Sequence, residues 1–164
     1  MVDFIGIENK LRRLDVEYNN NMQDPDLPVF YSKLAVLEFS GWLEDSIDDI
    51  LFRYIDSHIL DTKVRDEIRK SVRKNYGFHY YNNLFKLFTS VLGVNNWENI
   101  EDALKPQKFH DLIDVANTYS GIRNQAAHSS IVVMHTFSSP SSTIAAYNRV
   151  KPAIMAIDNE ISKL

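Results

Sequence analysis

Apolar residues recur every three or four positions along most of the chain, and this spacing constrains the fold more than any other feature. Between Pro28 and Ser57 they fall within a narrow arc at 100° per residue, comprising Val36, Phe39, Leu43, Ile47, Ile50 and Tyr54. Such an arc is typical of the buried face of an amphipathic helix. No useful length of sequence alternates apolar and polar residues as a half-buried strand does. The sequence therefore predicts an all-α fold.

The helical pattern divides into five or six main helices within one domain, residues 1–164. Helices are expected over residues 3–18, 28–57, 62–75 and 80–92, from 109 through 128, and over 144–161, with a short helical piece at 97–104. Glycine or proline ends several of them, at Gly77, Gly93 and Pro106, and a break is expected over 138–142. Pro152 lies inside the last predicted helix and can kink it. A chain of this length can bury a sizeable core without disulfides or metals.

The predicted helix over 28–57 carries apolar residues on a second side as well. These residues are Leu34, Leu37, Phe52 and Ile55. A helix that is apolar on two sides is either central in its own domain or covered by a second subunit. The second reading is a first indication of a dimer.

Composition removes several classes of function. The chain has no cysteine, which excludes disulfides, thiolate nucleophiles and cysteine-based zinc sites, and favours a reducing, cytoplasmic location. No apolar run approaches the roughly 18 residues of a membrane helix, and the acidic N-terminal segment does not resemble a signal peptide, so a soluble protein without membrane contact is expected. A net charge of −4 means that any RNA contact must come from a local patch.

Common catalytic and metal-binding motifs are absent from the sequence. It contains no glycine-rich phosphate loop, Gly-x-Ser-x-Gly elbow or His-Glu-x-x-His motif. His110 and Asp114 share a helix face but lack a third ligand. No metal or cofactor is therefore expected.

The segment Arg123–His128, with the sequence RNQAAH, places an arginine and a histidine five positions apart. This spacing is a weak signal by itself, because Arg53 and His58 repeat it, and Arg73 and His79 come close to it. The surroundings of the first pair are more specific. Asn124 follows Arg123 directly, two alanines would permit close helix packing, and the segment comes shortly before a break and the final helix.

On these residues the chain resembles the HEPN superfamily, whose ribonuclease members carry Arg-x4–6-His on a late helix, often with Asn after the Arg. The stretch 40–51 resembles the early helix of a defence-associated subgroup, similar to RiboL-PSP-HEPN proteins, in which a Glu follows an apolar pair. Glu44 is the matching position, and Glu38 is a less favoured one. The resemblance is specific over about 120–130, suggestive over 36–55 and loose elsewhere between 28 and 164.

The resemblance implies a helical bundle that forms a homodimer through its late, motif-bearing helix, bringing two Arg/His sets into one cleft. It implies a metal-independent endoribonuclease that cleaves single-stranded or loop RNA by 2′-hydroxyl transfer and leaves a 2′,3′-cyclic phosphate. A toxin or anti-phage effector with an antitoxin or regulatory partner fits this class. The implied catalytic residues are Arg123, Asn124, His128 and Glu44.

The residue types suit this chemistry. Histidine as a residue type can transfer protons near neutral pH, which suits position 128, whereas Arg123 stays charged and presents a planar fork to phosphate oxygens. Asn124 and His128 are four apart and share a helix face, so Asn124 can orient the histidine ring or contact phosphate. Glu44 would hold Arg123 or raise the basicity of His128.

Structural readings of the same residues stay open. Arg123 pairs alternatively with Asp114 or Asp45 at the surface, His128 is alternatively a helix-end histidine favoured by the dipole, and Glu44 is alternatively a solvated acid. A predicted RNA-binding stripe, Arg65, Arg69 and Arg73, is alternatively a solvated face.

The sequence also leaves alternatives for other histidine and aromatic residues, and for the function itself. His79 with Tyr80 and Tyr81 is either a base-stacking site or, more favoured, a packed cluster. His135, just beyond the motif, is a further candidate to line a cleft. The competing functions are a non-catalytic HEPN module that dimerises and binds RNA, a nucleotide or a partner, and a plain helical scaffold.

Overall fold

The computed structural model describes residues 2–128 and 137–164, and every regular element in these ranges is helical. The elements are α1 (Phe4–Asn20), α2 (Leu27–His58), α3 (Thr62–Arg73), a short π-helical turn η1 (Tyr80–Leu84), α4 (Phe85–Leu92), α5 (Val94–Ala103), α6 (Pro106–His128) and α7 (Pro140–Ile161). The predicted all-α class is confirmed. The expectation of five or six main helices was too low, since these ranges contain seven α-helices.

The differences from the sequence prediction arise at helix starts. The piece expected at 97–104 is a full helix that begins at Val94, and α6 begins at Pro106 rather than at Phe109. Similarly, α7 begins at Pro140, so part of the predicted break forms its first turn. Proline lacks the N–H that would go unpaired in the first turn and has a helical φ, so it starts helices as readily as it ends them.

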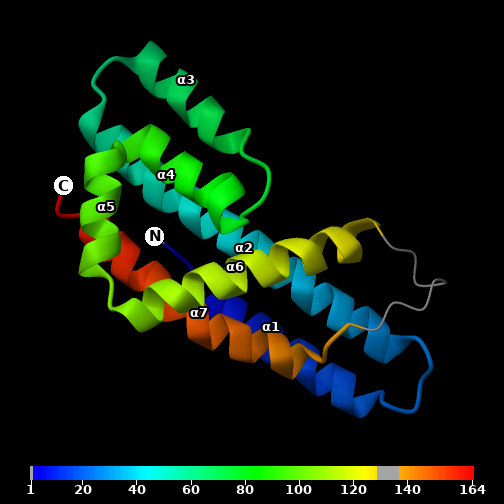
Figure 1. Ribbon diagram of the computed structural model, residues 1–164. Helices are drawn as coiled ribbons and strands as arrows, with labels where there is room; N and C mark the ends of the chain where they lie inside the picture. Colours follow the sequence, from blue (N-terminus) through cyan, green and yellow to red (C-terminus); the bar gives the residue numbers. More distant parts are fainter. Residues whose placement is uncertain (1, 129–136) are drawn as a thin grey trace.

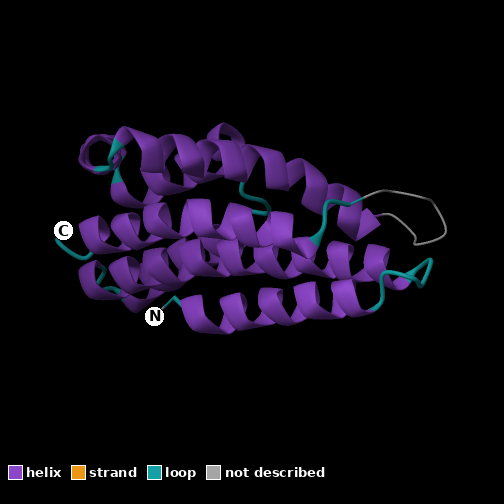
Figure 2. Ribbon diagram, turned by 90° about the horizontal axis from the view of Figure 1, so that it is seen from below, coloured by secondary structure: helices purple, strands orange, loops and turns teal. Residues whose placement is uncertain are grey.

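Four long helices, α1, α2, α6 and α7, lie alongside one another, while α3, α4 and α5 gather at one end of the bundle (Figure 1). Figure 2, turned by 90°, shows the same arrangement of helices from below. The two termini lie towards the end where α5 is found. Within the described ranges, no helix combines the length and apolar character needed to cross a membrane.

The central element is α2, which packs against α1, α3, α4, α6 and α7. Its predicted core arc is largely buried, and Phe39 and Leu43 have no exposed surface. On the second apolar side Ile55 is fully buried, and Leu34 and Phe52 pack partly buried against the core. The two-sided pattern is thus explained by a central position in one copy, and it no longer indicates a second subunit.

Aromatic side chains fill both ends of the core. Phe39 stacks on Trp42 and meets Tyr119 of α6 edge-on, with ring centroids 5.9 Å and 4.8 Å apart. Near α5, Phe88 and Trp97 stack almost parallel with centroids 4.0 Å apart. The contact of Phe39 with Tyr119 packs α6 against α2 and therefore helps to set the position of the motif at the end of α6.

The segment that links α3 to α4 has a defined path. Gly77 has φ of +104°, a region that favours glycine, and the Tyr80 amide donates to Asn117 Oδ1 of α6 at 2.9 Å. The amides of Asn83 and Leu84 both donate to the His79 carbonyl, at 2.8 Å and 3.3 Å, which widens the first turn into η1. The predicted helix over 80–92 is thus present, but its first turn is π-helical. Gly93, with φ of +85°, ends it as predicted.

Side-chain contacts join α7, the last helix, to α1, the first. Tyr147 donates its hydroxyl to the Phe4 carbonyl at 2.8 Å, and Lys151 pairs with Glu8 at 3.3 Å. The predicted position of Pro152 inside α7 is confirmed. Helix α7 thereby lies in the core beside both α1 and α2.

Candidate functional site

The last turns of α6 carry the predicted motif. Ala126 is fully buried, and its small side chain lets α6 lie close to its neighbours. Asn124 and His128 are exposed, and Arg123 is half-buried. His128 occupies the final helical turn, where the helix dipole favours a positive charge. The motif therefore presents two polar side chains to solvent and one towards the body of the protein.

Arg123 reaches across to Glu44 in the middle of α2. Its Nη2 lies 3.6 Å from Glu44 Oε2, and its Nη1 donates to Asn124 Oδ1 at 3.3 Å. The two ion-pair side chains keep 32% and 28% of their surface exposed. The contact expected between Arg123 and Glu44 is thus present. Of the alternative partners, Asp114 is engaged by Arg149 at 2.8 Å.

Glu44 is electrostatically unusual. Burial raises the pKa of its carboxyl and the charge of Asp45 adds to this, while Arg123 and the backbone amide of Gly77 lower it, leaving the pKa above its ordinary value. Its second oxygen, Oε1, is buried, and within the described ranges no donor meets it with hydrogen-bond geometry. Glu44 is therefore held in a position that a solvated acid would not occupy.

A small cleft of about 120 Å³ lies beside Glu44 and was not expected from the sequence. Its lining includes Asp48 of α2, Arg73 of α3, and Tyr76 and Gly77 of the following segment. Burial raises the pKa of Asp48 to about 6; the charges of Asp45 and Glu44 add to this effect, and Arg73 opposes it. The only available sequence signal was the spacing of Glu44 and Asp48 by four on one helix.

Of the two alternative roles expected for Glu44, the contact with Arg123 is present, and within the described ranges no hydrogen bond joins Glu44 to His128. Asn124 and His128 do share the exposed face of α6, as their spacing predicted. A single copy thus brings Arg123, Asn124 and Glu44 together and leaves the histidine ring open to solvent.

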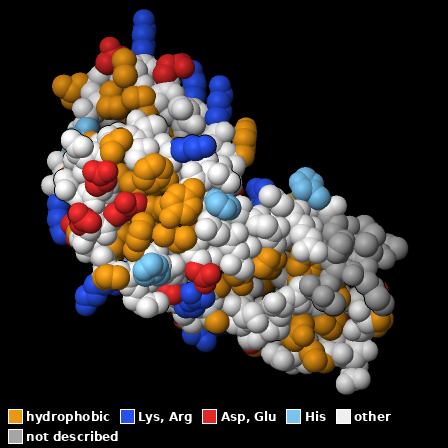
Figure 3. Space-filling model, viewed as in Figure 1, with side chains coloured by type: hydrophobic (Ala, Val, Ile, Leu, Met, Phe, Trp, Pro, Cys, Tyr) orange, Lys and Arg blue, Asp and Glu red, His pale blue; other side chains and the backbone are white. Residues whose placement is uncertain are grey.

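The predicted RNA-binding arginines of α3 turn partly towards α2. Arg69 pairs with Asp56 at 2.5 Å and lies 4.3 Å from the centre of the Phe52 ring. Arg73 lies 5.3 Å from the same ring, and Arg65 is half-buried. On the face drawn in Figure 3, lysine and arginine side chains are scattered and do not form one continuous patch. The contacts of Arg69 and Arg73 are structural, and RNA binding by this stripe stays a prediction.

The second Arg-x4-His pair has a structural role. Arg53 pairs with Asp49 at 3.1 Å and with Asp158 of α7 at 2.8 Å. His58 stacks on Tyr54 with centroids 4.2 Å apart, and its Nδ1 lies 2.9 Å from the Tyr54 carbonyl oxygen. These contacts tie the end of α2 to its surroundings and explain the pair without chemistry.

The aromatic residues after His79 form a packed cluster, the reading that the sequence favoured. Tyr80 is buried, meets Tyr81 and Phe109 edge-on, and donates its hydroxyl to Glu101. Burial and this carboxylate raise the pKa of Tyr80. No three acidic or histidine side chains within the described ranges converge as metal ligands, and His135 lies outside these ranges.

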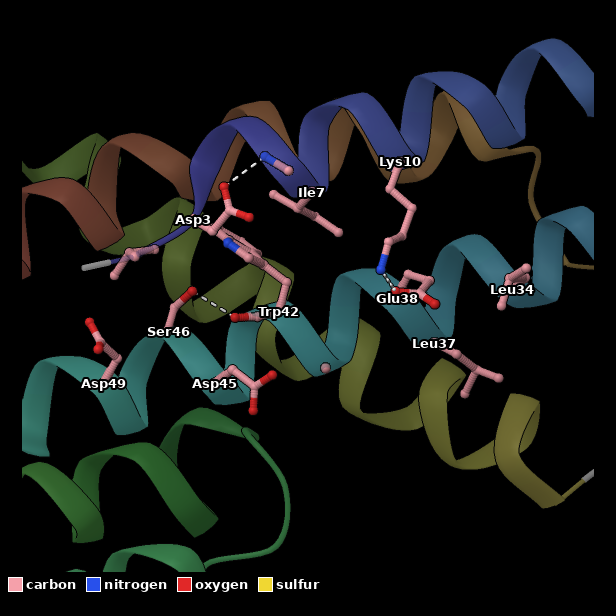
Figure 4. Close-up of a pocket in the computed structure, with 13 residues that line it drawn as sticks. Asp3, Ile7, Lys10, Leu34, Leu37, Glu38, Trp42, Asp45, Ser46 and Asp49 are labelled. Atoms are coloured by element: carbon pink, nitrogen blue, oxygen red, sulfur yellow. Dashed lines mark hydrogen bonds and ion pairs between the residues drawn. The ribbon is translucent and has the colours of Figure 1, made fainter.

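A groove of about 710 Å³ lies between α1 and α2 (Figure 4). Its walls combine apolar side chains, including Ile7 and Trp42, with a bridge from Lys10 to Glu38 at 2.7 Å. Asp45 lines both this groove and the cleft beside Glu44. One exposed side chain of α2 therefore borders both hollows.

Comparisons with known proteins identify no relative. The chain matches no family model, and no curated protein or solved structure is significantly similar to it. The assignment of a function consequently depends on the geometry of the residues themselves.

Proposed function

We propose that this protein is a HEPN-type, metal-independent endoribonuclease that acts as a homodimer on single-stranded or loop RNA. The observation that carries the proposal is the pairing of Arg123 with Glu44 next to two exposed polar side chains, Asn124 and His128. An ordinary surface motif would not require a half-buried acid from the centre of another helix. Here that acid fixes the arginine at one edge of an exposed histidine-bearing face.

These side chains suit cleavage by internal transfer. The 2′-oxygen of a ribose loses its proton to a base and bonds to phosphorus, while the bond from phosphorus to the 5′-oxygen breaks and that oxygen gains a proton. The products are a 2′,3′-cyclic phosphate and a 5′-hydroxyl. His128 would transfer protons, and the Arg123 guanidinium would offset the phosphate charge in the transition state. Asn124 would donate to a phosphate oxygen through its amide nitrogen.

One copy supplies only one histidine in the motif, whereas the reaction needs both a base and an acid. A second copy would supply the other His128 if the exposed ends of the two α6 helices meet across a two-fold axis. Burial between two subunits would also strengthen the interaction of Arg123 with phosphate, because water would be excluded. The homodimer is therefore part of the proposal.

The test is incubation of the purified protein with transfer RNA and messenger RNA in the presence of EDTA. Cleavage with cyclic-phosphate ends is expected, with large losses in His128→Ala and Arg123→Ala. His58→Ala is the matched control, because it removes the histidine of the second Arg-x4-His pair, and it should remain active. Cleavage of no substrate, or full activity of His128→Ala, would exclude the proposal.

A second candidate is a non-catalytic HEPN module that dimerises and binds RNA, a nucleotide or a partner protein. The acidic surroundings of Arg123 favour it, because Glu44, Asp45 and Asp48 all lie on the neighbouring face of α2 and the net charge is −4. RNA binding that persists in His128→Ala, with no product from the unaltered protein, would select this candidate. A toxin role with an antitoxin partner belongs only to the first.

A further inference from the structure

Tyr76 is an aromatic side chain that the fold leaves in solvent. It is 82% exposed, more than any other aromatic residue in the described ranges, and it belongs to the segment between α3 and η1. An exposed aromatic ring offers a flat face on which a nucleic-acid base can stack.

The backbone that carries this ring is fixed on both sides. The side-chain amide of Asn83 donates through Nδ2 to the Tyr76 carbonyl at 3.1 Å, and the side-chain amide of Asn75 donates through Nδ2 to the Gly77 carbonyl at 3.3 Å. Phe78, only two residues further on, is buried in the core. The ring therefore projects from an anchored stem, so that little backbone freedom would be lost when a ligand stacks on it.

The ring also lies beside the candidate site. Tyr76 lines the same small cleft as Glu44, and the amide of the next residue, Gly77, faces the Glu44 carboxyl. Glu44 in turn contacts Arg123. One continuous set of contacts thus links the segment that carries the exposed ring to the proposed phosphate-binding arginine.

The charges at the cleft and at Arg123 determine whether a phosphate or a base of an RNA strand can lie at each of these two places. Asp45 and Asp48 stand by the cleft and would repel a phosphate, whereas Arg123 attracts one. A strand whose phosphate meets Arg123 would therefore turn a base, rather than its backbone, towards the cleft. The acids, which disfavour RNA binding as a whole, orient a strand once it is bound at Arg123.

We infer that Tyr76 is a substrate-positioning residue that stacks an unpaired base of single-stranded RNA close to the phosphate held by Arg123. This inference rests on the proposed function. Base–aromatic stacking is sequence-tolerant and needs an unstacked base, which makes single-stranded or loop RNA the substrate class. Loss of such a stack weakens binding roughly tenfold to a hundredfold.

The experiment measures binding of a short, fluorescently labelled 2′-O-methyl oligonucleotide, which has no free 2′-hydroxyl and is not cleaved. Tyr76→Ala should weaken binding roughly tenfold to a hundredfold, while Tyr76→Phe should bind as tightly as the unaltered protein does. Tyr81→Ala is the matched control, because Tyr81 is also exposed, at 58%, but packs on Tyr80. An oligonucleotide of abasic residues should bind Tyr76→Ala and the unaltered protein equally.

Salt dependence separates stacking from a charge effect. Tyr76→Ala should leave the slope of log affinity against log salt unchanged, because stacking releases no counterions, whereas Arg123→Ala should lower the slope by about one. If His128-dependent cleavage occurs but Tyr76→Ala binds as tightly as the unaltered protein, the inference fails and the proposed function stands. If the unaltered protein neither binds nor cleaves RNA, both fail.

Discussion

Replacing Asp48 with Asn should make the protein more stable at neutral pH, although it removes a native charged side chain. Asp48 is half-buried beside Asp45 and Glu44, and its pKa is about 6 against an ordinary value of 3.8. Its charged form is therefore disfavoured by folding, mainly through burial and secondly through the neighbouring acids. Asn keeps nearly the same shape and helix propensity but carries no charge.

The sign of the pH dependence follows from the raised pKa. The contribution of Asp48 to stability is fully present below its unfolded pKa, near 3.8, and is lost as the pH rises through about 6. A difference of about two pH units corresponds to about 3 kcal/mol. Because Asp48 is only half-buried, solvent screening reduces the expected gain for Asp48→Asn to about 1 kcal/mol at pH 7.

The measurement is urea unfolding, followed by circular dichroism, of both proteins at a series of pH values from about 4 to about 8. The free energy of unfolding of Asp48→Asn should exceed that of the unaltered protein at pH 7, and the difference should shrink towards pH 4. Asp111→Asn is the matched control with the opposite sign. Arg149 and, to a smaller extent, Gln107 hold the pKa of Asp111 below its ordinary value, so this variant should be less stable at pH 7. A loss of stability in Asp48→Asn at pH 7 would refute the reasoning.

Three further substitutions test the fold. Phe88→Ala removes a fully buried ring stacked on Trp97 and should cost about 3–5 kcal/mol in urea unfolding; a loss below about 1 kcal/mol would contradict the packing. Asp61→Ala removes the cap whose Oδ1 accepts from the Lys63 and Val64 amides at 2.8 Å and 3.1 Å, and should cost about 1 kcal/mol, with unchanged stability as the contrary result. Gly41→Ala, inside α2, adds a methyl group that has no heavy atom within 4 Å apart from its chain neighbours and the backbone of its own helix. This variant should be more stable by about 0.5–1 kcal/mol and should melt at a higher temperature; a lower melting temperature would show that the methyl group is crowded.

The long helices could be predicted because their apolar spacing repeats over many turns. The arc on α2 located the core correctly, and the glycines at 77 and 93 marked real turns with positive φ. Helix starts at Pro106 and Pro140 were missed, since a proline can begin or end a helix and local sequence does not decide between the two. The sequence also left open whether α2 is central or covered by another subunit, which only its packing partners resolve.

The candidate site was predictable to the extent that it depends on a motif. The contact of Arg123 with Glu44 was expected, and it joins residues on two helices that the spacing placed separately. The cleft with Asp48 and Tyr76 was not, because it depends on the path of the segment after α3. That path is set by contacts such as the Tyr80 amide with Asn117, 37 positions apart, which no local pattern encodes.

The position of α7 has a consequence for how the protein is made. Its buried face, which includes Val150, Ile154 and Ile157, packs against the core beside α1 and α2, yet α7 leaves the ribosome only after the other described helices. Until then the matching surfaces of α1 and α2 have no cover, and they are open to chaperones or to aggregation. Translation that stops before α7 should therefore yield an insoluble or rapidly degraded product, even though the motif at 123–128 has already been synthesised.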